Sequence, residues 1–279
     1  MLLSRKLYNN WNILFLFILV LALILFYRGI PWVQNINEED SLLRQVAGGD
    51  RISFSGIDRN HSFIFVGGYP RSGTTLMRVL LDAHPHIRCG QETRLIPKFL
   101  SFVSLAVYKR SSKERERLKE AGLTDKVIDE AVASFITEII VRHGKMAPRL
   151  CNKDPLSFKN LSYLGKLFPN AKFIFMVRDG RAVANSITSR HVTISHVNTR
   201  DYRSLLKSWS STVLLMNDQC RKLGHRCLRV PYEYLVLNPV QCMKTVLQFV
   251  DAVWNDAVLH HELEFNKNDG IALSRLVDH

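Results

Sequence analysis

The chain has 279 residues, more than one average domain needs and too few for two once an apolar N-terminal segment is set aside. Lysine and arginine number 38 against 25 aspartate and glutamate residues, which gives a formal net charge of +13. The sequence therefore predicts one core of roughly 200 to 250 residues and an acidic partner or substrate. Nucleic acid, anionic lipid, a phosphorylated nucleotide and an acidic protein all satisfy that charge.

The first element along the chain is an apolar run at residues 11–27, in which Asn12 is the only strongly polar member. Extended to residue 30 it reaches ~20 residues, the length that a helix needs to cross a bilayer. Basic residues precede the run and acidic residues follow it, so the positive-inside rule places the N-terminus in the cytosol. We expect a cytosolic tail (1–10), a transmembrane signal anchor (11–30) and a stem (31–60). A cleaved signal peptide is the alternative.

The core opens with a strand, a glycine loop and a helix, the order found in phosphate-binding loops. The stretch 62-SFIFVGG-68 predicts a buried strand, and a helical pattern from Thr74 ends at 84-HPH-86. Between them, 68-GYPRSGTT-75 lacks the lysine of the G-x-x-x-x-G-K-[ST] pattern. We interpret Arg71 as the replacement charge, because a guanidinium donates paired hydrogen bonds to a tetrahedral oxyanion. A tight turn with a surface arginine is the alternative.

Helix and strand patterns alternate through the rest of the chain. Residues 109–120 are densely charged and predict a solvated helical face, and 172-KFIFMV-177 predicts a second strand. A helix is expected over 203–221, followed by a third strand candidate at 227–233, where Pro231 suggests an edge or a strand end. The alternation predicts an α/β fold with a central, mainly parallel sheet flanked by helices.

The cysteines and asparagine triplets carry weaker signals. In a luminal domain two pairs of cysteines can form disulfides and leave one over, whereas the alternative for each is a small buried side chain. No cysteine or histidine cluster has the spacing of a zinc site, so no metal is expected. Asn60 and Asn160 each begin an N-x-S triplet, the acceptor pattern for glycosylation. The five cysteines are Cys89, Cys151, Cys220, Cys227 and Cys242.

Four segments stand out in chain order: 66-VGGYPRSGTTLMRVLLDAHPHIRCGQETR-94, 151-CNKDP-155, 178-RDGRA-182 and 257-AVLHHE-262. Together they resemble the tyrosylprotein sulfotransferases. The resemblance implies a P-loop-like sulfotransferase domain over 61–279, luminal in a type II Golgi membrane protein. It also implies transfer of a sulfuryl group from 3′-phosphoadenosine 5′-phosphosulfate (PAPS) to tyrosine in acidic segments of secreted and membrane proteins. The implied partners are these acidic proteins and a second copy of the chain, with no nucleic acid.

The resemblance assigns a set of residues to the donor. The 5′-phosphosulfate would lie over the loop, and the 3′-phosphate would be bound from the segment that begins at residue 178. Taken alone, Ser186 would be a helix-surface serine and Tyr232 a packed aromatic. The implied donor-binding residues are Arg71, Ser72, Gly73, Thr74, Thr75, Arg178, Ser186, Arg190 and Tyr232.

By the same resemblance Glu92 is the catalytic base, with Arg71, Lys153 and Ser274 stabilising the transition state. Complete transfer of a proton from a phenol of pKa about 10 to a carboxylate of pKa about 4.3 costs ~8 kcal/mol of free energy. Proton transfer while the O–S bond forms avoids that cost. The alternative for Glu92 is a surface ion pair with Arg94.

Arg94 and Lys98 would hold acidic residues around the acceptor tyrosine, and a generally solvated basic face is the alternative. The resemblance pairs Cys89 with Cys151 and Cys220 with Cys227, which leaves Cys242 unpaired. In one departure from the family, Gln91 replaces the first of two glutamates.

In a second departure the chain stops at 273-LSRLVDH-279, so the domain is expected to be short at its C-terminal end. The main alternative is therefore a truncated, weakly active or inactive member that retains donor or acceptor binding. A nucleotide-dependent kinase, a carbohydrate sulfotransferase and a non-enzymatic membrane-anchored binding protein are further alternatives.

Overall fold

The computed structural model describes residues 56–105, 111–195, 197–264 and 271. The expected tail, anchor and most of the stem lie outside the described residues, as does Ser274. In the described part no helix is both long enough and apolar enough to span a membrane. The chain divides into two units at residue 56, and the description below concerns the second.

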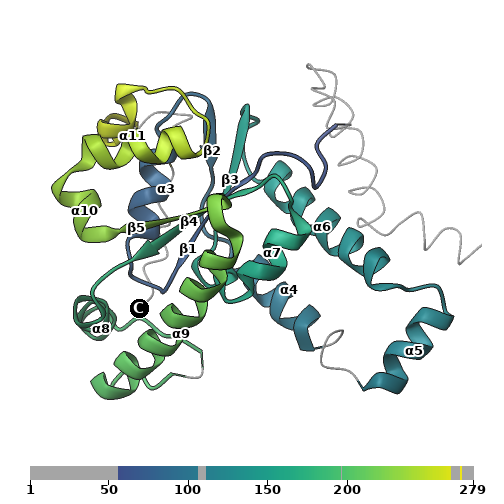
Figure 1. The fold of residues 1–279 in the computed structure, drawn as a ribbon. Helices are drawn as coiled ribbons and strands as arrows, with labels where there is room; N and C mark the ends of the chain where they lie inside the picture. The colour runs from purple at the N-terminus through teal and green to yellow at the C-terminus, as the bar shows by residue number, and fades with distance from the viewer. Residues whose placement is uncertain (1–55, 106–110, 196, 265–270, 272–279) are drawn as a thin grey trace, which may run out of the picture. The chain divides into compact units, whose positions relative to one another are not determined.

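A parallel sheet lies at the centre of the described part (Figure 1). Its strands run in the order β2-β3-β1-β4-β5, and every neighbouring pair is parallel. The bounds are β1 (Ile64–Gly68), β2 (Ile87–Cys89), β3 (Arg149–Lys153), β4 (Lys172–Val177) and β5 (Cys227–Pro231). The predicted parallel α/β architecture is confirmed.

The strand order reverses beside the first strand. From β1 the chain continues to β2, on the side of β1 where β3 lies. From β4, which pairs with the other side of β1, it continues outward to β5. In open α/β sheets ligands bind outside the carboxyl ends of the strands at such a switch point. The loops after β1 and β4 are therefore the first place to look for a site.

Helices cover both faces of the sheet, with α3 and α11 on one face and α4, α6 and α7 on the other (Figure 1). Their bounds are α3 (Thr74–Asp82), α4 (Leu95–Val103), α5 (Ser112–Glu120), α6 (Asp125–Arg142), α7 (Leu161–Leu167), α8 (Gly180–Ser189), α9 (Tyr202–Leu223), α10 (Tyr232–Leu237) and α11 (Pro239–Phe249). Short 3-10 segments lie at Pro155–Asn160, Gly224–Arg226, Asp256–Leu259 and His261–Glu264.

The alternating side chains of β1 divide the core in two. Phe65 packs on the face of α6 and α7 and stacks on Phe173 of β4 with ring centroids 5.4 Å apart, whereas Ile64 and Val66 face α3 and α11. Each such side chain, once fully buried, contributes about 1.5–3 kcal/mol to folding. Burial on both faces is what makes these strands near-continuous apolar runs in the sequence.

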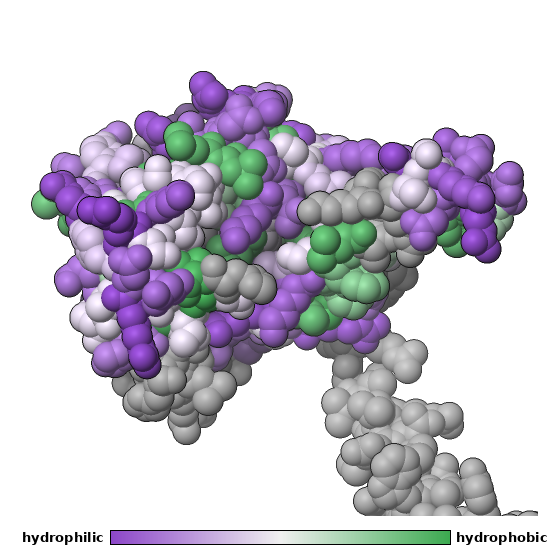
Figure 2. All heavy atoms as spheres, turned by 90° about the horizontal axis from the view of Figure 1, so that it is seen from below, coloured by the Kyte–Doolittle hydropathy of each residue, from purple (hydrophilic) through white to green (hydrophobic). Residues whose placement is uncertain are grey.

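The surface agrees with the basic, charged composition. On the face shown in Figure 2 hydrophilic side chains predominate, and hydrophobic ones gather in separate smaller patches. Helix α5 has no buried residue, which confirms the predicted solvated face, and it begins with a capping box formed by Ser111 and Glu114. The third predicted strand ends earlier than expected, since Tyr232 directly after Pro231 already opens α10.

Candidate active site

The loop after β1 has the geometry of an anion cradle. Gly73 has φ 95°, in the left-handed region, and a Cβ there would lie 2.4 Å from Cδ2 of Tyr232, so glycine is required twice over. Arg71 is also left-handed, with φ 69°. Helix α3 begins at Thr74 without a side-chain hydrogen bond to its first turn. Its N-terminal N–H groups and the positive end of its dipole are available to an anion.

Four of the residues expected to bind the donor meet beside this loop. Arg71 Nε donates to Ser186 Oγ on α8 at 3.1 Å. Arg178 follows β4, donates from Nη1 to the backbone oxygen of Arg71 at 3.1 Å, and lies with Cζ 4.3 Å from the ring centroid of Tyr232. The structure thus brings together segments that end β1, β4 and β5. Arg190 is exposed at the end of α8, and these contacts do not include it.

Two buried polar atoms suit a bound oxyanion. Among the described residues Ser72 Oγ and Arg178 Nε have no hydrogen-bond partner, and both are shielded from solvent. A buried polar group without a partner costs about 1–3 kcal/mol. Both atoms are hydrogen-bond donors. The residues present therefore fit a phosphate or phosphosulfate group, as the predicted binding of PAPS requires.

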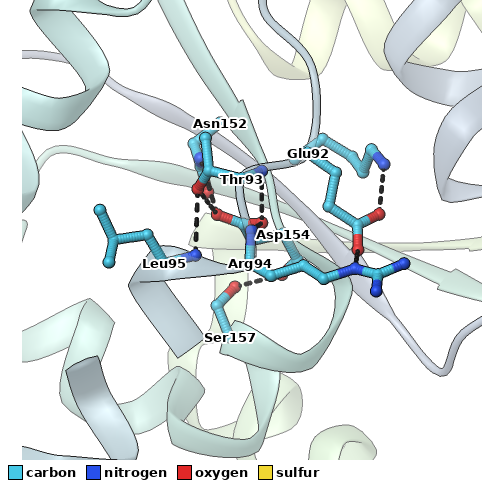
Figure 3. A network of polar contacts seen from close by, with 8 residues as sticks. Glu92, Thr93, Arg94, Leu95, Asn152, Asp154 and Ser157 are labelled. Carbon is cyan, nitrogen blue, oxygen red and sulfur yellow. Dashed lines mark hydrogen bonds and ion pairs between the residues drawn. The ribbon is translucent and has the colours of Figure 1, made fainter. Parts of the chain in front are cut away.

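A second polar group lies beyond the ends of β2 and β3. Lys153 Nζ, at the end of β3, donates to Glu92 Oε2 at 2.6 Å, and Arg94 Nε donates to Glu92 Oε1 at 3.1 Å (Figure 3). The Lys153 side chain is 4% exposed and that of Glu92 is 28% exposed. Burial lowers the pKa of Lys153, and the neighbouring Glu92 carboxylate raises it. The Glu92–Arg94 ion pair does exist, but Glu92 is also the partner of a buried lysine.

Asp154 directly follows Lys153 and is fully buried. Its Oδ1 accepts from the backbone N–H groups of Thr93 at 3.1 Å and Arg94 at 2.7 Å. Its Oδ2 accepts from Thr93 Oγ1 at 3.0 Å and Asn152 Nδ2 at 3.3 Å (Figure 3). Burial raises the pKa of Asp154, and the hydrogen bonds that it accepts lower it. Asp154 lies in 151-CNKDP-155, and no motif in the sequence assigned it a role.

The comparisons with known proteins follow the same residues. A model of the sulfotransferase family matches residues 63–256. The protein-tyrosine sulfotransferase of Drosophila melanogaster is 54% identical over 220 residues, 78% of this chain and 44% of that protein. A relative from Caenorhabditis briggsae is 43% identical over 198 residues, 71% of this chain and 68% of its own.

This chain belongs to the protein-tyrosine sulfotransferase family. It spans about half the length of several curated relatives, among them the Drosophila protein. Among solved structures, the sulfotransferase domain from the curacin biosynthetic pathway has a TM-score of 0.51 at 20% identity, covering 77% of this chain and 81% of that chain. That likeness confirms the sulfotransferase fold.

Both disulfides that the sulfotransferase resemblance implied are present. Cys89 and Cys151 are bonded and oppose each other in the β2–β3 register, three residues before Glu92 and two before Lys153. The second disulfide joins Cys220 on α9 to Cys227 at the start of β5. The remaining cysteine, in α11, is a buried free thiol.

A hollow of ≈ 880 Å³ opens beside the candidate base Glu92. Glu92 and Gln91 form part of its wall. The wall carries charges of both signs, because Asp82 lines it beside the cationic side chains and forms an ion pair with Arg78 at 3.0 Å. Other lining residues are Arg78, Arg88, His143, Lys145 and Asn255.

Several assignments made from the sequence remain predictions. Arg94 and Lys98 are exposed, one at the base segment and the other on α4. Asn60 is exposed and Asn160 is partly buried before α7, and the glycosylation of either stays a prediction. In the described part of the chain no group of three or more potential metal ligands is clustered.

Proposed function

We propose that the chain transfers the sulfuryl group of PAPS to tyrosine hydroxyls in acidic segments of secreted and membrane proteins. The observation that carries the proposal is the Glu92–Lys153 pair, 2.6 Å apart, at the same edge of the sheet as an anion cradle with buried, unpartnered donors. Membership of the protein-tyrosine sulfotransferase family favours this reaction over phosphate transfer and over sulfation of sugars.

For the donor, we assign the 5′-phosphosulfate to Arg71, the Ser72 hydroxyl and the N–H groups of residues 73–75, because the Ser72 N–H already donates to the backbone oxygen of Tyr69 at 3.1 Å. The 3′-phosphate and the nucleotide are assigned to Arg178, Ser186 and Tyr232, with Arg190 further along α8. The donor supplies an activated sulfuryl group. Arg71 offers positive charge where the leaving phosphate oxygens gain negative charge, and its guanidinium is already oriented by Ser186.

For the acceptor, Glu92 takes the phenolic proton while the phenolic oxygen bonds to sulfur and the bond from sulfur to the phosphate oxygen breaks. The products are tyrosine sulfate and 3′-phosphoadenosine 5′-phosphate (PAP). A positioned base of this kind contributes ~100 to 10,000-fold in rate. Lys153 keeps a positive charge beside Glu92, and we assign to it, together with Ser274, the developing charge on the bridging oxygen.

Acidic residues of the acceptor would be attracted by Lys145 in the wall of the hollow and by Arg94 and Lys98. We further propose a type II protein of the Golgi membrane, anchored by residues 11–30, with a luminal catalytic domain that forms a homodimer. Two disulfides support an oxidising compartment. No metal is assigned a role.

The test is donor-dependent transfer by the purified full-length chain in detergent. Labelled sulfate should pass from PAPS to a peptide with a tyrosine among acidic residues, and a matched peptide with phenylalanine should stay unlabelled. Binding of PAP without any transfer would favour the alternative of an inactive member that retains its donor site. If neither transfer nor PAP binding occurred, the proposal would be wrong.

A further inference from the structure

A single buried carboxylate, that of Asp154, binds the backbone of the segment that carries Glu92. Asp154 accepts hydrogen bonds from the two N–H groups that directly follow Glu92, those of Thr93 and Arg94. The same carboxylate binds the Thr93 hydroxyl, which in turn accepts from the N–H of Leu95, the first residue of α4 (Figure 3). One side chain therefore fixes both the base segment and the start of the next helix.

We propose that Asp154 is a positioning residue for the reaction, which sets Glu92 at hydrogen-bonding distance from Lys153 by anchoring the backbone behind it. The inference rests on the proposed function for its catalytic consequence, and on the contacts of Asp154 for its structural part. Asp154 itself is fully buried and lies behind the base, so it has no role in proton transfer.

Lys153, the last residue of β3, and Asp154, which directly follows it, bind different parts of the same segment. Lys153 binds the side chain of Glu92, and Asp154 binds the backbone that follows it. Arg94 adopts the left-handed conformation, with φ 57°, which a non-glycine residue keeps only when its surroundings determine it. The hydrogen bonds from the N–H groups of Thr93 and Arg94 to Asp154 Oδ1 stabilise this backbone conformation.

Asp154 is well suited to act as a fixed point. Its own backbone oxygen accepts from Ser157 Oγ at 2.6 Å, and Pro155 follows it directly. A buried carboxylate needs several donors to remain charged, and the four donors around Asp154 satisfy both of its oxygens. Replacement by an amide puts donors where Asn152 and Thr93 now donate, so part of the network must open.

The experiment compares Asp154→Asn and Thr93→Val with the full-length wild type. Thr93→Ser is the matched control, because it keeps the hydroxyl that Asp154 binds. Tyr163→Phe is the remote control, because it removes a hydrogen bond of 2.9 Å to another buried carboxylate, Asp129 on α6. Amide hydrogen exchange of peptides covering residues 90–96 is measured together with kcat and with the KM for PAPS.

The expected result is faster exchange at residues 90–96 in Asp154→Asn and Thr93→Val, with unchanged exchange in β1 and β4. We expect kcat to fall ~10 to 100-fold while the KM for PAPS stays within about twofold, because misplacing a catalytic group by about 1 Å costs rate rather than donor binding. Thr93→Ser and Tyr163→Phe should behave as the wild type in both readouts.

Two results would overturn the inference: unchanged exchange at 90–96 in Asp154→Asn, or an equal loss of kcat in Tyr163→Phe. Failure of the proposed function is recognised separately, because it would abolish turnover in the wild type as well. The exchange measurement then decides the structural part by itself, with faster exchange supporting the anchoring role of Asp154 and unchanged exchange refuting it.

Discussion

The loop after β1 and the segment after β2 lie at the same edge of the sheet, yet they are built in opposite ways. Ser72 Oγ in the loop and Arg178 Nε, which follows β4 and lies beside the loop, are buried donors that no described residue satisfies. In the base segment, both oxygens of Glu92 and both oxygens of Asp154 already have donors. The PAPS-binding half of the site, around the loop after β1, is thus arranged to receive an anion. The half that carries the base, around Glu92 and Asp154, is organised before any ligand binds.

The largest expected effect comes from removing the base. Glu92→Ala should lower kcat for tyrosine sulfation by ~100 to 10,000-fold, because the phenolic proton loses its acceptor. The affinity for PAP should stay within about twofold, since the hydrogen bonds that join Arg71 to Ser186 and Arg178 do not involve Glu92. Steady-state kinetics and calorimetry measure the two quantities. Full turnover in Glu92→Ala would refute the assignment of the base.

Removing the lysine should have a smaller effect. Lys153→Met should lower kcat by ~100 to 1,000-fold, the range found for the loss of one group that stabilises developing charge. The Cys89–Cys151 disulfide, which joins the two strands that lead to the pair, should still form, and this is checked by counting free thiols. An unchanged kcat would limit Lys153 to a structural role.

A third prediction concerns the PAPS-binding half of the site. Arg71→Ala should weaken PAP binding ~10 to 100-fold, because it removes charge-assisted hydrogen bonds worth about 1.5–3 kcal/mol. Arg190→Ala, which changes an exposed arginine outside the Arg71 network, is the comparison and should weaken binding less. An unchanged affinity for PAP in Arg71→Ala would show that the cradle lies elsewhere. Calorimetric titration with PAP measures both.

The smallest effect is on stability and depends on pH. Glu92→Gln removes the carboxylate that raises the pKa of Lys153, so burial lowers that pKa further. Between this lowered pKa of the folded state and the ordinary lysine value of 10.5, the unfolded chain binds a proton that the folded chain has released, so the free energy of unfolding rises with pH in that range. At pH 7 we expect Glu92→Gln to be about 1–3 kcal/mol less stable than the wild type.

Urea unfolding at pH 7 and pH 9 measures this difference, which should shrink at the higher pH. In the double variant Glu92→Gln with Lys153→Met no ionisable pair remains, so the shrinkage should disappear. A difference that grew with pH would contradict the assigned direction of the Lys153 shift.

Local patterns were enough to predict the loop between β1 and α3, because strand, glycines and helix follow one another within one short stretch of chain. The resemblance added Glu92, Lys153 and both disulfides. Strands β2 and β3 were missed as strands, since β2 has three residues and β3 ends in the polar pair Asn152 and Lys153. Their strand conformation depends on neighbours far away in the sequence.

The role of Asp154 could not be predicted for the same reason. Its partners Thr93 and Arg94 lie 61 and 60 residues earlier in the chain, and no local period connects them. A carboxylate after a buried strand more often suggests a ligand site than an anchor for backbone N–H groups. Only the parallel pairing of β2 with β3 brings these residues together.

Hydrogen exchange of the full-length chain with and without PAP tests the contrast between the two halves most directly. The account predicts slower exchange in the loop at residues 69–75 on addition of PAP, because the loop N–H groups and Arg71 acquire an anion. Exchange at residues 90–96 should be the same with and without PAP, since Asp154 and Lys153 already hold that segment. If PAP slowed exchange at residues 90–96, or left exchange at residues 69–75 unchanged, the account would be contradicted.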